Sequence, residues 1–306
     1  MRHTKRLTLY QLNKEWVNRK GYRKSWNYCN QMGIAFDHMV KAIGDKPARN
    51  VKLNDLEDYQ KYLYERLSPS SVRSYIKAVR SVFNWACSRS LIPSSPFDEK
   101  FEIVKSRKRD IHIYTRKELE AMFAVTTNTR VQAIIMAAYE TGMRIGEIQN
   151  VTFDDIEDGV IHVRSKKKTK FTWAWEPKNG EERDVPMTQT LNGYIIRLQL
   201  ELPVNQPYPF LSEKTYNKLL RKGELPERTR KSPDSAWPCI FRRIKKRAGI
   251  KKGVFHDFRV TRLSLWSHVL SPQDHKELSG HKDFETTMRY YLVPSDNYLD
   301  VARQAI

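Results

Sequence analysis

Apolar side chains recur at helical spacing through most of the first hundred residues. Leu9-Leu12-Trp16 and Leu56-Tyr59-Leu63 each line one face of a helix. The clearest pattern comes after Ser68-Pro69, a helix cap with an early proline, where the apolar positions form one continuous stripe: Val72, Tyr75, Ile76, Val79, Val82, Phe83 and Ala86. We therefore predict a helical unit over residues 8–95.

Prolines and a charged run separate this unit from the rest of the chain. Pro93, Pro96 and the run from Lys105 to Asp110 interrupt the helical pattern. A chain of 306 residues, at roughly 100–200 residues per domain, has room for two domains. We predict an N-terminal domain at 1–104, a linker at 105–114 and a second domain at 115–306.

The second domain combines helices with a few short strands. Thr115-Arg-Lys-Glu118 is a capping box ahead of a helix, and a second, apolar helix from Val131 to Tyr139 ends at a turn at Thr141-Gly142. Three stretches have strand-like patterns: Gly159–Val163, Lys170–Trp175 and Arg183–Pro186. Asn179-Gly180 is a strong hairpin signal between the last two. The expected fold class is mainly α with a small antiparallel β-sheet.

The charge of the chain favours a nucleic acid partner. The formal net charge is +20, and residues 1–108 carry +12 of it, with 22 Lys and Arg against 10 Asp and Glu. Basic proteins bind polyanions by displacing condensed counterions. Arg73, Lys77 and Arg80 lie off the apolar stripe and are candidates for contacts with a DNA backbone. A generally basic surface, or a solvated helix face, remains the alternative.

Cysteines and the N-terminus exclude other classes of protein. Cys29, Cys87 and Cys239 are widely spaced, so neither a disulfide framework nor a zinc site is expected, and we interpret all three as buried thiols. The sequence suggests no metal and no cofactor. Met1 to Arg6 has no apolar run typical of a signal peptide, and the longest apolar stretch is too short to cross a bilayer. A cytoplasmic protein associated with DNA is expected.

Three separated segments carry a specific pattern. They are Tyr139-Glu-Thr-Gly-Met-Arg144-Ile-Gly-Glu147-Ile, His256-Asp-Phe-Arg259 and Leu278-Ser-Gly-His281-Lys-Asp-Phe-Glu-Thr-Thr-Met-Arg-Tyr290. Their order and spacing resemble the active-site boxes of the tyrosine recombinase (phage integrase) family. The resemblance covers the second domain well. It extends more loosely through Ser68 to Phe97, which is similar to the end of the family's helical core-binding domain.

The resemblance implies an enzyme that cleaves and rejoins DNA through a covalent 3′-phosphotyrosine. In this chemistry Tyr290 is the nucleophile. Arg144 and Arg259 would hold the nonbridging oxygens, whose negative charge grows in the transition state. His256 and His281 would assist proton transfer and orient the phosphate. Neither metal nor ATP is implied.

Three assignments leave alternatives open. Tyr291 is next to the nucleophile, but successive side chains on a helix point about 100° apart, so we expect Tyr291 to serve packing. Glu147 would support the site indirectly, unless it is a surface carboxylate. The general acid would be Lys178, five residues before Arg183, whereas shorter family members have their lysine directly after the first strand, where this chain has four lysines: Lys166, Lys167, Lys168 and Lys170.

The resemblance also implies partners. Homodimers would form on each double-stranded DNA site and a homotetramer at synapsis, with accessory DNA-bending proteins as further partners. Residues 296–306 would be a tail docked on a neighbouring subunit or a helix packed on its own domain. Two rival functions remain: DNA relaxation like that of a type IB topoisomerase, and non-catalytic DNA binding on a recombinase fold.

Overall fold

The computed structural model describes residues 6–24, 26–98, 101–103, 110–221, 233–281 and 283–291. At positions 26, 179, 221 and 289–291 it describes the backbone alone. The chain forms two compact units, Met1–Arg109 and Asp110–Ile306, which are described separately. Residues 105–109 of the expected linker and the expected tail at 296–306 lie outside the described residues.

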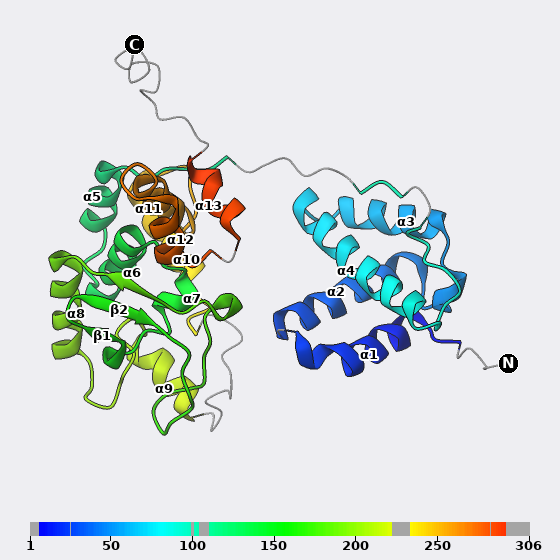
Figure 1. The fold of residues 1–306 in the computed structure, drawn as a ribbon, viewed down its shortest axis with the longest axis horizontal. Coiled ribbons are helices and arrows are strands. Elements are labelled where there is room, and N and C mark those ends of the chain that lie inside the picture. The colour runs from blue at the N-terminus through cyan, green and yellow to red at the C-terminus, as the bar shows by residue number, and fades with distance from the viewer. Residues whose placement is uncertain are drawn as a thin grey trace, which may run out of the picture. The chain divides into compact units, whose positions relative to one another are not determined.

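Among the described residues, four α-helices build the N-terminal unit (Figure 1): α1 Leu9–Lys20, α2 Trp26–Ile43, α3 Leu53–Tyr64 and α4 Pro69–Ser88. Ser68 caps α4 by accepting a hydrogen bond from the Ser71 amide. Helix α2 packs against the other three. The expected helical character of this unit is confirmed.

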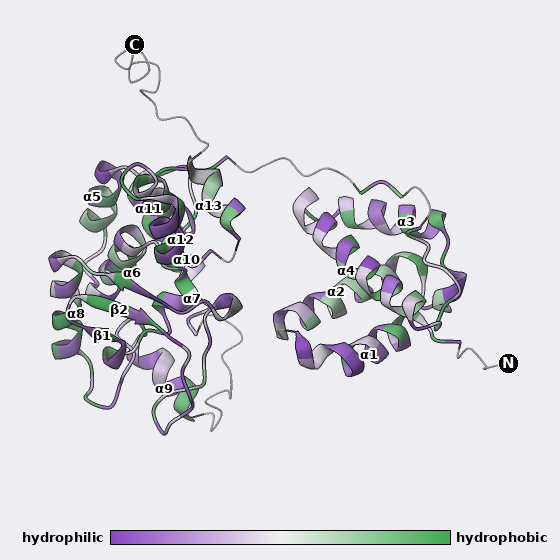
Figure 2. Cartoon of the chain, viewed as in Figure 1, coloured by the Kyte–Doolittle hydropathy of each residue, from purple (hydrophilic) through white to green (hydrophobic). Residues whose placement is uncertain are grey.

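The apolar stripe of α4 forms the centre of this unit. Val72, Ile76, Val79 and Phe83 are fully buried, and the Phe83 ring stacks against Phe36 of α2 with centroids 6.5 Å apart. Hydrophobic and hydrophilic segments alternate within the helices of both units (Figure 2), as expected for helices with one face in a core.

The second unit is also mainly helical. Its helices are α5 Arg116–Ala124, α6 Thr129–Thr141, α7 Ile145–Ile148, α8 Gln189–Glu201, α9 Glu213–Arg221, α10 Trp237–Arg247, α11 Asp257–Trp266, α12 Pro272–Ser279 and α13 Phe284–Tyr291. The capping box of Thr115 and Glu118 begins α5 as predicted. Helix α6 is buried along most of its length and packs against α8 and α11.

A three-stranded antiparallel sheet completes this unit, in the order β1 Ile156–Glu157, β2 Val160–Val163, β3 Arg183–Pro186. The sequence predicted β2 and β3 but missed β1. Asp158 and Gly159 connect β1 to β2 with φ of 47° and 75°, the two positive values that a type I′ hairpin turn requires.

The expected strand at Lys170–Trp175 is wrong. Among the described residues this stretch makes one isolated bridge, between Lys166 and Trp175, because Trp173 and Trp175 are buried one by one in the unit while Phe171 is exposed. Asn179-Gly180 forms a 3-10 turn rather than a hairpin with that stretch, and β3 pairs with β2 instead.

The cysteine interpretation also needs correction. Cys239 is exposed, while Cys29 and Cys87 are partly buried, so none is a fully buried thiol. Cys29 and Cys87 pack against the edge of the N-terminal core. No helix among the described residues is long and apolar enough to span a membrane.

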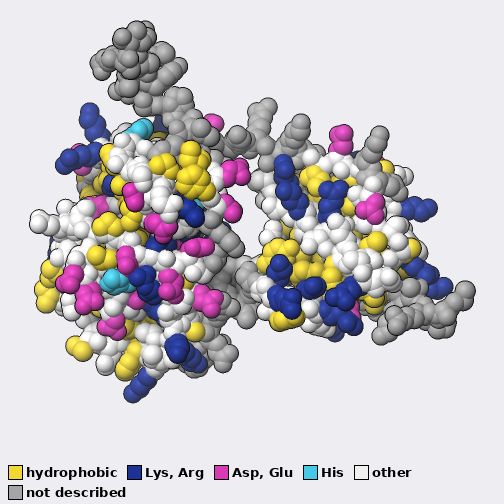
Figure 3. Space-filling model, in the orientation of Figure 1, with side chains coloured by type: hydrophobic (Ala, Val, Ile, Leu, Met, Phe, Trp, Pro, Cys, Tyr) yellow, Lys and Arg dark blue, Asp and Glu magenta, His cyan; other side chains and the backbone are white. Residues whose placement is uncertain are grey.

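The two units differ in how charge is spread over the face seen in Figure 3. Lys and Arg side chains are scattered over the N-terminal unit with few acidic neighbours, whereas on the second unit basic and acidic side chains are intermixed. This agrees with the excess of positive charge in residues 1–108.

Candidate active site

The first motif folds as a turn between two helices. Gly142 ends α6 in the left-handed conformation, with φ of 62°, and its carbonyl faces Arg259. Arg144 then caps α7. Its backbone amide donates to Glu147 Oε2 at 2.9 Å and its Nη1 donates to Oε1 at 2.7 Å. The spacing of three residues therefore places the guanidinium and the carboxylate side by side.

Glu147 is buried rather than exposed, so the surface-carboxylate interpretation is wrong. Arg183 Nη2 on β3 donates to Glu147 Oε2 at 2.6 Å, and both side chains are about 4% exposed or less. Burial alone would raise the pKa of Glu147, but the charges of Arg183, Arg144 and Arg259 outweigh it and hold the pKa at about 2. Glu147 therefore remains ionised at neutral pH.

Arg183 was not identified from the sequence as a residue of the site. Besides its pairing with Glu147, its Nε donates to the Leu278 carbonyl at 3.0 Å, which joins β3 to the end of α12. The alternation along β3, where Arg183 and Val185 are buried and Asp184 is exposed, was the available signal. A basic residue on the buried face of a strand requires a buried acidic partner.

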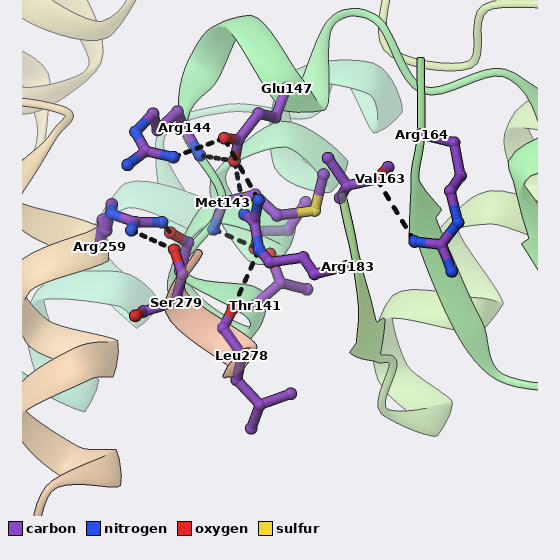
Figure 4. Close-up of polar contacts among 12 residues, drawn as sticks. Thr141, Met143, Arg144, Glu147, Val163, Arg164, Arg183, Arg259, Leu278 and Ser279 are labelled. Carbon is purple, nitrogen blue, oxygen red and sulfur yellow. Dashed lines mark hydrogen bonds and ion pairs between the residues drawn. The ribbon is translucent and has the colours of Figure 1, made fainter. Parts of the chain in front are cut away.

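Arg259, which belongs to the second motif, joins the other two (Figure 4). It lies on α11 and is only 3% exposed. Its Nη1 donates to the Gly142 carbonyl at 2.8 Å, and its Nη2 donates to the Ser279 carbonyl at 2.5 Å. The guanidinium is thus fixed between the turn that carries Arg144 and the end of the helix that precedes His281.

His281 comes directly after the left-handed Gly280 that ends α12. The imidazole is buried, and its Nδ1 lies 3.1 Å from the hydroxyl of Thr287 on α13. Burial, together with the positive charges of Arg259 and Arg144, lowers the pKa of His281 to about 3. The ring is therefore neutral at physiological pH, a form that both donates and accepts hydrogen bonds.

Gly280 is needed for close packing as well as for its backbone conformation. Its φ is 59°, and a Cβ at this position would lie 3.1 Å from Nη1 and 3.2 Å from Cδ of Arg183. The glycine between Ser279 and His281 in the third motif therefore leaves room for the arginine that holds Glu147.

Two of the remaining expected residues lie at the surface. His256 is exposed and precedes α11, and Lys178 is exposed in the 3-10 turn before β3. Tyr290 lies on α13, which packs against α11 and α12, but its side chain is outside the described part of the structure. The structure thus brings together Arg144, Glu147, Arg259 and His281.

The expected DNA-binding residues of α4 differ in environment. Lys77 is exposed and Arg73 is partly buried. Arg80 donates to the Phe97 carbonyl at 3.1 Å and lies over the Phe97 ring at 5.3 Å, so part of its role is to hold the segment after α4. No group of three or more potential metal ligands occurs among the described residues.

Known proteins are similar to this chain in sequence and in fold. Residues 113–296 match the phage integrase family, and the chain therefore belongs to this family of tyrosine recombinases. The tyrosine recombinase XerC of Oceanobacillus iheyensis is 26% identical over 289 residues, 88% of this chain and 85% of the relative.

Two solved structures share the fold. An integrase of the Tn1549 transposon in complex with a circular intermediate DNA is 17% identical, with a TM-score of 0.74 over 98% of this chain and 100% of that chain. A lambda integrase tetramer bound to a Holliday junction is 15% identical, with a TM-score of 0.72 over 94% of this chain and 78% of that chain.

The contact between Gly280 and Arg183 gives a test with a matched control. Alanine at Gly280 or at Gly159 costs about 1 kcal/mol for the left-handed backbone. Only at Gly280 does the new methyl group meet another side chain, since nothing lies within 4 Å of a Cβ at Gly159. We expect Gly280→Ala to slow single-turnover DNA cleavage by tenfold or more, on the order expected for a small displacement of a catalytic group. Gly159→Ala should cleave normally, and equal rates for the two variants would contradict this account.

The environment of His281 predicts its titration. Positive neighbours and burial disfavour the imidazolium, so protonation should occur only near pH 3. In an NMR titration of the DNA-free enzyme, the His281 resonance, assigned with His281→Asn, should not shift between pH 5 and 8. A midpoint near the ordinary histidine value of about 6.5 would show that the described electrostatics are wrong.

Proposed function

We propose that this protein is a site-specific DNA recombinase that cleaves and rejoins strands through a 3′-phosphotyrosine at Tyr290. The observation that carries the proposal is the gathering of Arg144 and Arg259 at the buried Glu147, with His281 close enough for the charges of both arginines to lower its pKa. Cationic donors held in advance stabilise the charge that develops on a phosphate in the transition state.

In the proposed reaction the Tyr290 hydroxyl attacks phosphorus and the bond from phosphorus to the 5′ oxygen breaks. Arg144, whose side chain is 24% exposed, and Arg259 would hold the nonbridging oxygens. Neutral His281 would donate a hydrogen bond to the phosphate, and His256 would assist proton transfer. The phosphotyrosine retains the bond energy, so rejoining requires no ATP.

Lys178 would donate the proton to the leaving 5′ oxygen. Among its four competitors, Lys166 is only 12% exposed, and its ammonium group is paired with Asp155. Lys178 is exposed, as are Lys167, Lys168 and Lys170. A proton donor must be able to reach the substrate, which favours Lys178 over Lys166.

The substrate would be double-stranded DNA at the nucleoid, with the N-terminal unit contributing Arg73, Lys77 and Arg80 to the interface. The lambda integrase tetramer on a Holliday junction supports a homotetramer at synapsis, and a lambda integrase dimer bound to a core site supports a homodimer on each site. Nothing among the described residues specifically supports accessory DNA-bending proteins, topoisomerase-like relaxation or non-catalytic binding.

Replacing the nucleophile tests the proposal directly. On a nicked suicide substrate, the wild-type protein should form a covalent adduct visible in denaturing gels. Tyr290→Phe should form none and still bind DNA, because the change removes one oxygen from a broad interface. Tyr291→Phe is the matched control and should form the adduct. The reverse pattern would identify Tyr291 as the nucleophile.

The use of arginines instead of a divalent ion predicts resistance to chelation. Adduct formation should proceed at an unchanged rate in excess EDTA. Binding should weaken steeply with salt, since each phosphate contact releases a counterion. Loss of cleavage in EDTA with recovery on adding magnesium would indicate a metal-dependent nuclease.

A further inference from the structure

The segment between β2 and β3, residues 164–182, is folded against the second unit rather than forming a simple hairpin. Lys166 and Trp175 pair through both backbone hydrogen bonds, at 2.8 and 3.1 Å. At the tip, the Thr169 amide donates to the Thr172 carbonyl at 2.9 Å. The segment therefore has a closed base and a short exposed tip.

Trp173 anchors the base of this segment. It is fully buried and stacks on Tyr208, with ring centroids 4.1 Å apart and planes 7° from parallel. Its indole Nε1 donates to Asn150 Oδ1 at 2.7 Å, and its backbone amide donates to the Tyr208 hydroxyl at 3.2 Å. Both the ring and the polar groups of Trp173 are thus fixed.

Asn150 connects this anchor to the active site. It is buried, and its Nδ2 donates to the carbonyl of Gly146 at 2.6 Å. Gly146 is in α7, directly before Glu147. The Asn150 side chain therefore accepts a hydrogen bond from the segment 164–182 and donates one to α7, the helix that carries Glu147, the partner of Arg144.

Lys166 attaches the segment 164–182 to the second unit by a separate set of contacts. Its ammonium group pairs with Asp155 and donates to the carbonyl of Asn150. Asp155 in turn accepts from the backbone amide and hydroxyl of Thr152, at 2.5 and 2.7 Å. Burial lowers the pKa of Lys166, while the charge of Asp155 opposes this effect. The pair ties the start of the segment to the chain after α7.

Lys178 lies in the chain between two residues that are held in place, Trp175 and Arg183. Trp175, three residues before it, is buried and paired with Lys166, and Pro177 is also buried. Arg183, five residues after it, is held by Glu147. Five residues reach at most about 17 Å when fully extended, so these two attachments limit where the Lys178 backbone can go.

We propose that Trp173, Asn150 and Lys166 are positioning residues that hold Lys178 in place to protonate the leaving 5′ oxygen. The inference rests on the proposed function, because it requires Lys178 to be the general acid. A general acid acts only when it reaches the leaving oxygen, and small displacements of a catalytic group cost large factors in rate. The buried anchor fixes the segment before DNA binds.

A substrate with sulfur in place of the bridging 5′ oxygen separates positioning from general damage. The departing thiolate is stable without a proton, so a defect confined to the general acid disappears on this substrate. Single-turnover cleavage of oxygen- and sulfur-bridged DNA is measured for the full-length wild type, Lys178→Ala, Trp173→Ala and Trp173→Phe. Leu198→Ala, which removes a buried side chain from α8, is the matched control for lost core packing.

We expect Lys178→Ala to be slower by a hundredfold or more on oxygen-bridged DNA, roughly the usual contribution of a general acid, and to be close to wild type on sulfur. Trp173→Ala should show the same selective defect, about tenfold or larger, and Trp173→Phe a smaller one because it keeps the stacked ring. Leu198→Ala should show no difference between the two substrates.

Each other outcome contradicts a defined part of the proposal. If Trp173→Ala is equally slow on both substrates, or normal on both, the anchor does not position the general acid. If Lys178→Ala is not rescued by sulfur while wild type forms the adduct, Lys178 is not the acid and the inference fails although the recombinase function stands. If wild type forms no adduct on either substrate, the proposed function itself is wrong.

Discussion

The site depends on the ion pairs that the buried carboxylate of Glu147 makes with Arg183 and Arg144. An ionised group in a protein interior is stable only when charges and hydrogen bonds replace the water it has lost. Arg183 and Arg144 supply both, and the resulting pKa of about 2 keeps the carboxylate charged. In return, Glu147 reduces the repulsion among three guanidinium groups that lie close together, those of Arg144, Arg183 and Arg259. The cluster can therefore exist before a phosphate binds.

This preassembly has a direct consequence for the proposed chemistry. Donors that are already oriented do not have to reorganise when charge develops on the phosphate. The structure achieves the orientation with backbone as well as side chains, because Arg259 donates to the carbonyls of Gly142 and Ser279. Two left-handed glycines, Gly142 and Gly280, turn the chain where these groups meet.

Local patterns were sufficient to predict much of the fold. Helix caps at Ser68 and Thr115 and the stripe of α4 depend on neighbours within a few residues, and the structure confirms them. The strand expected at Lys170–Trp175 was wrong because alternation of apolar residues cannot distinguish a paired strand from an irregular segment whose tryptophans are buried one by one. The turn at Asp158-Gly159 was a local signal that was overlooked.

The site could be predicted only in part. The motifs predict Arg144, Arg259 and His281 as site residues, since each stands in a distinctive short segment, and the structure brings the three together. Arg183 was missed because its partners, Glu147 and Leu278, are 36 and 95 residues away, and no local pattern encodes such a pairing. The anchoring of Trp173 by Asn150 is of the same kind.

The most direct test of this account asks whether Glu147 acts through Arg144. In single-turnover cleavage, Glu147→Gln alone should be slower than wild type by about tenfold or more, as expected when a catalytic group loses its orientation. Groups that act as a unit are strongly non-additive. If the account is right, Arg144→Ala and the double variant Arg144→Ala/Glu147→Gln should therefore cleave at nearly the same rate. If the two effects instead multiply, Glu147 does not act through Arg144, and the orienting role given to the ion pair of Glu147 with Arg144 is wrong.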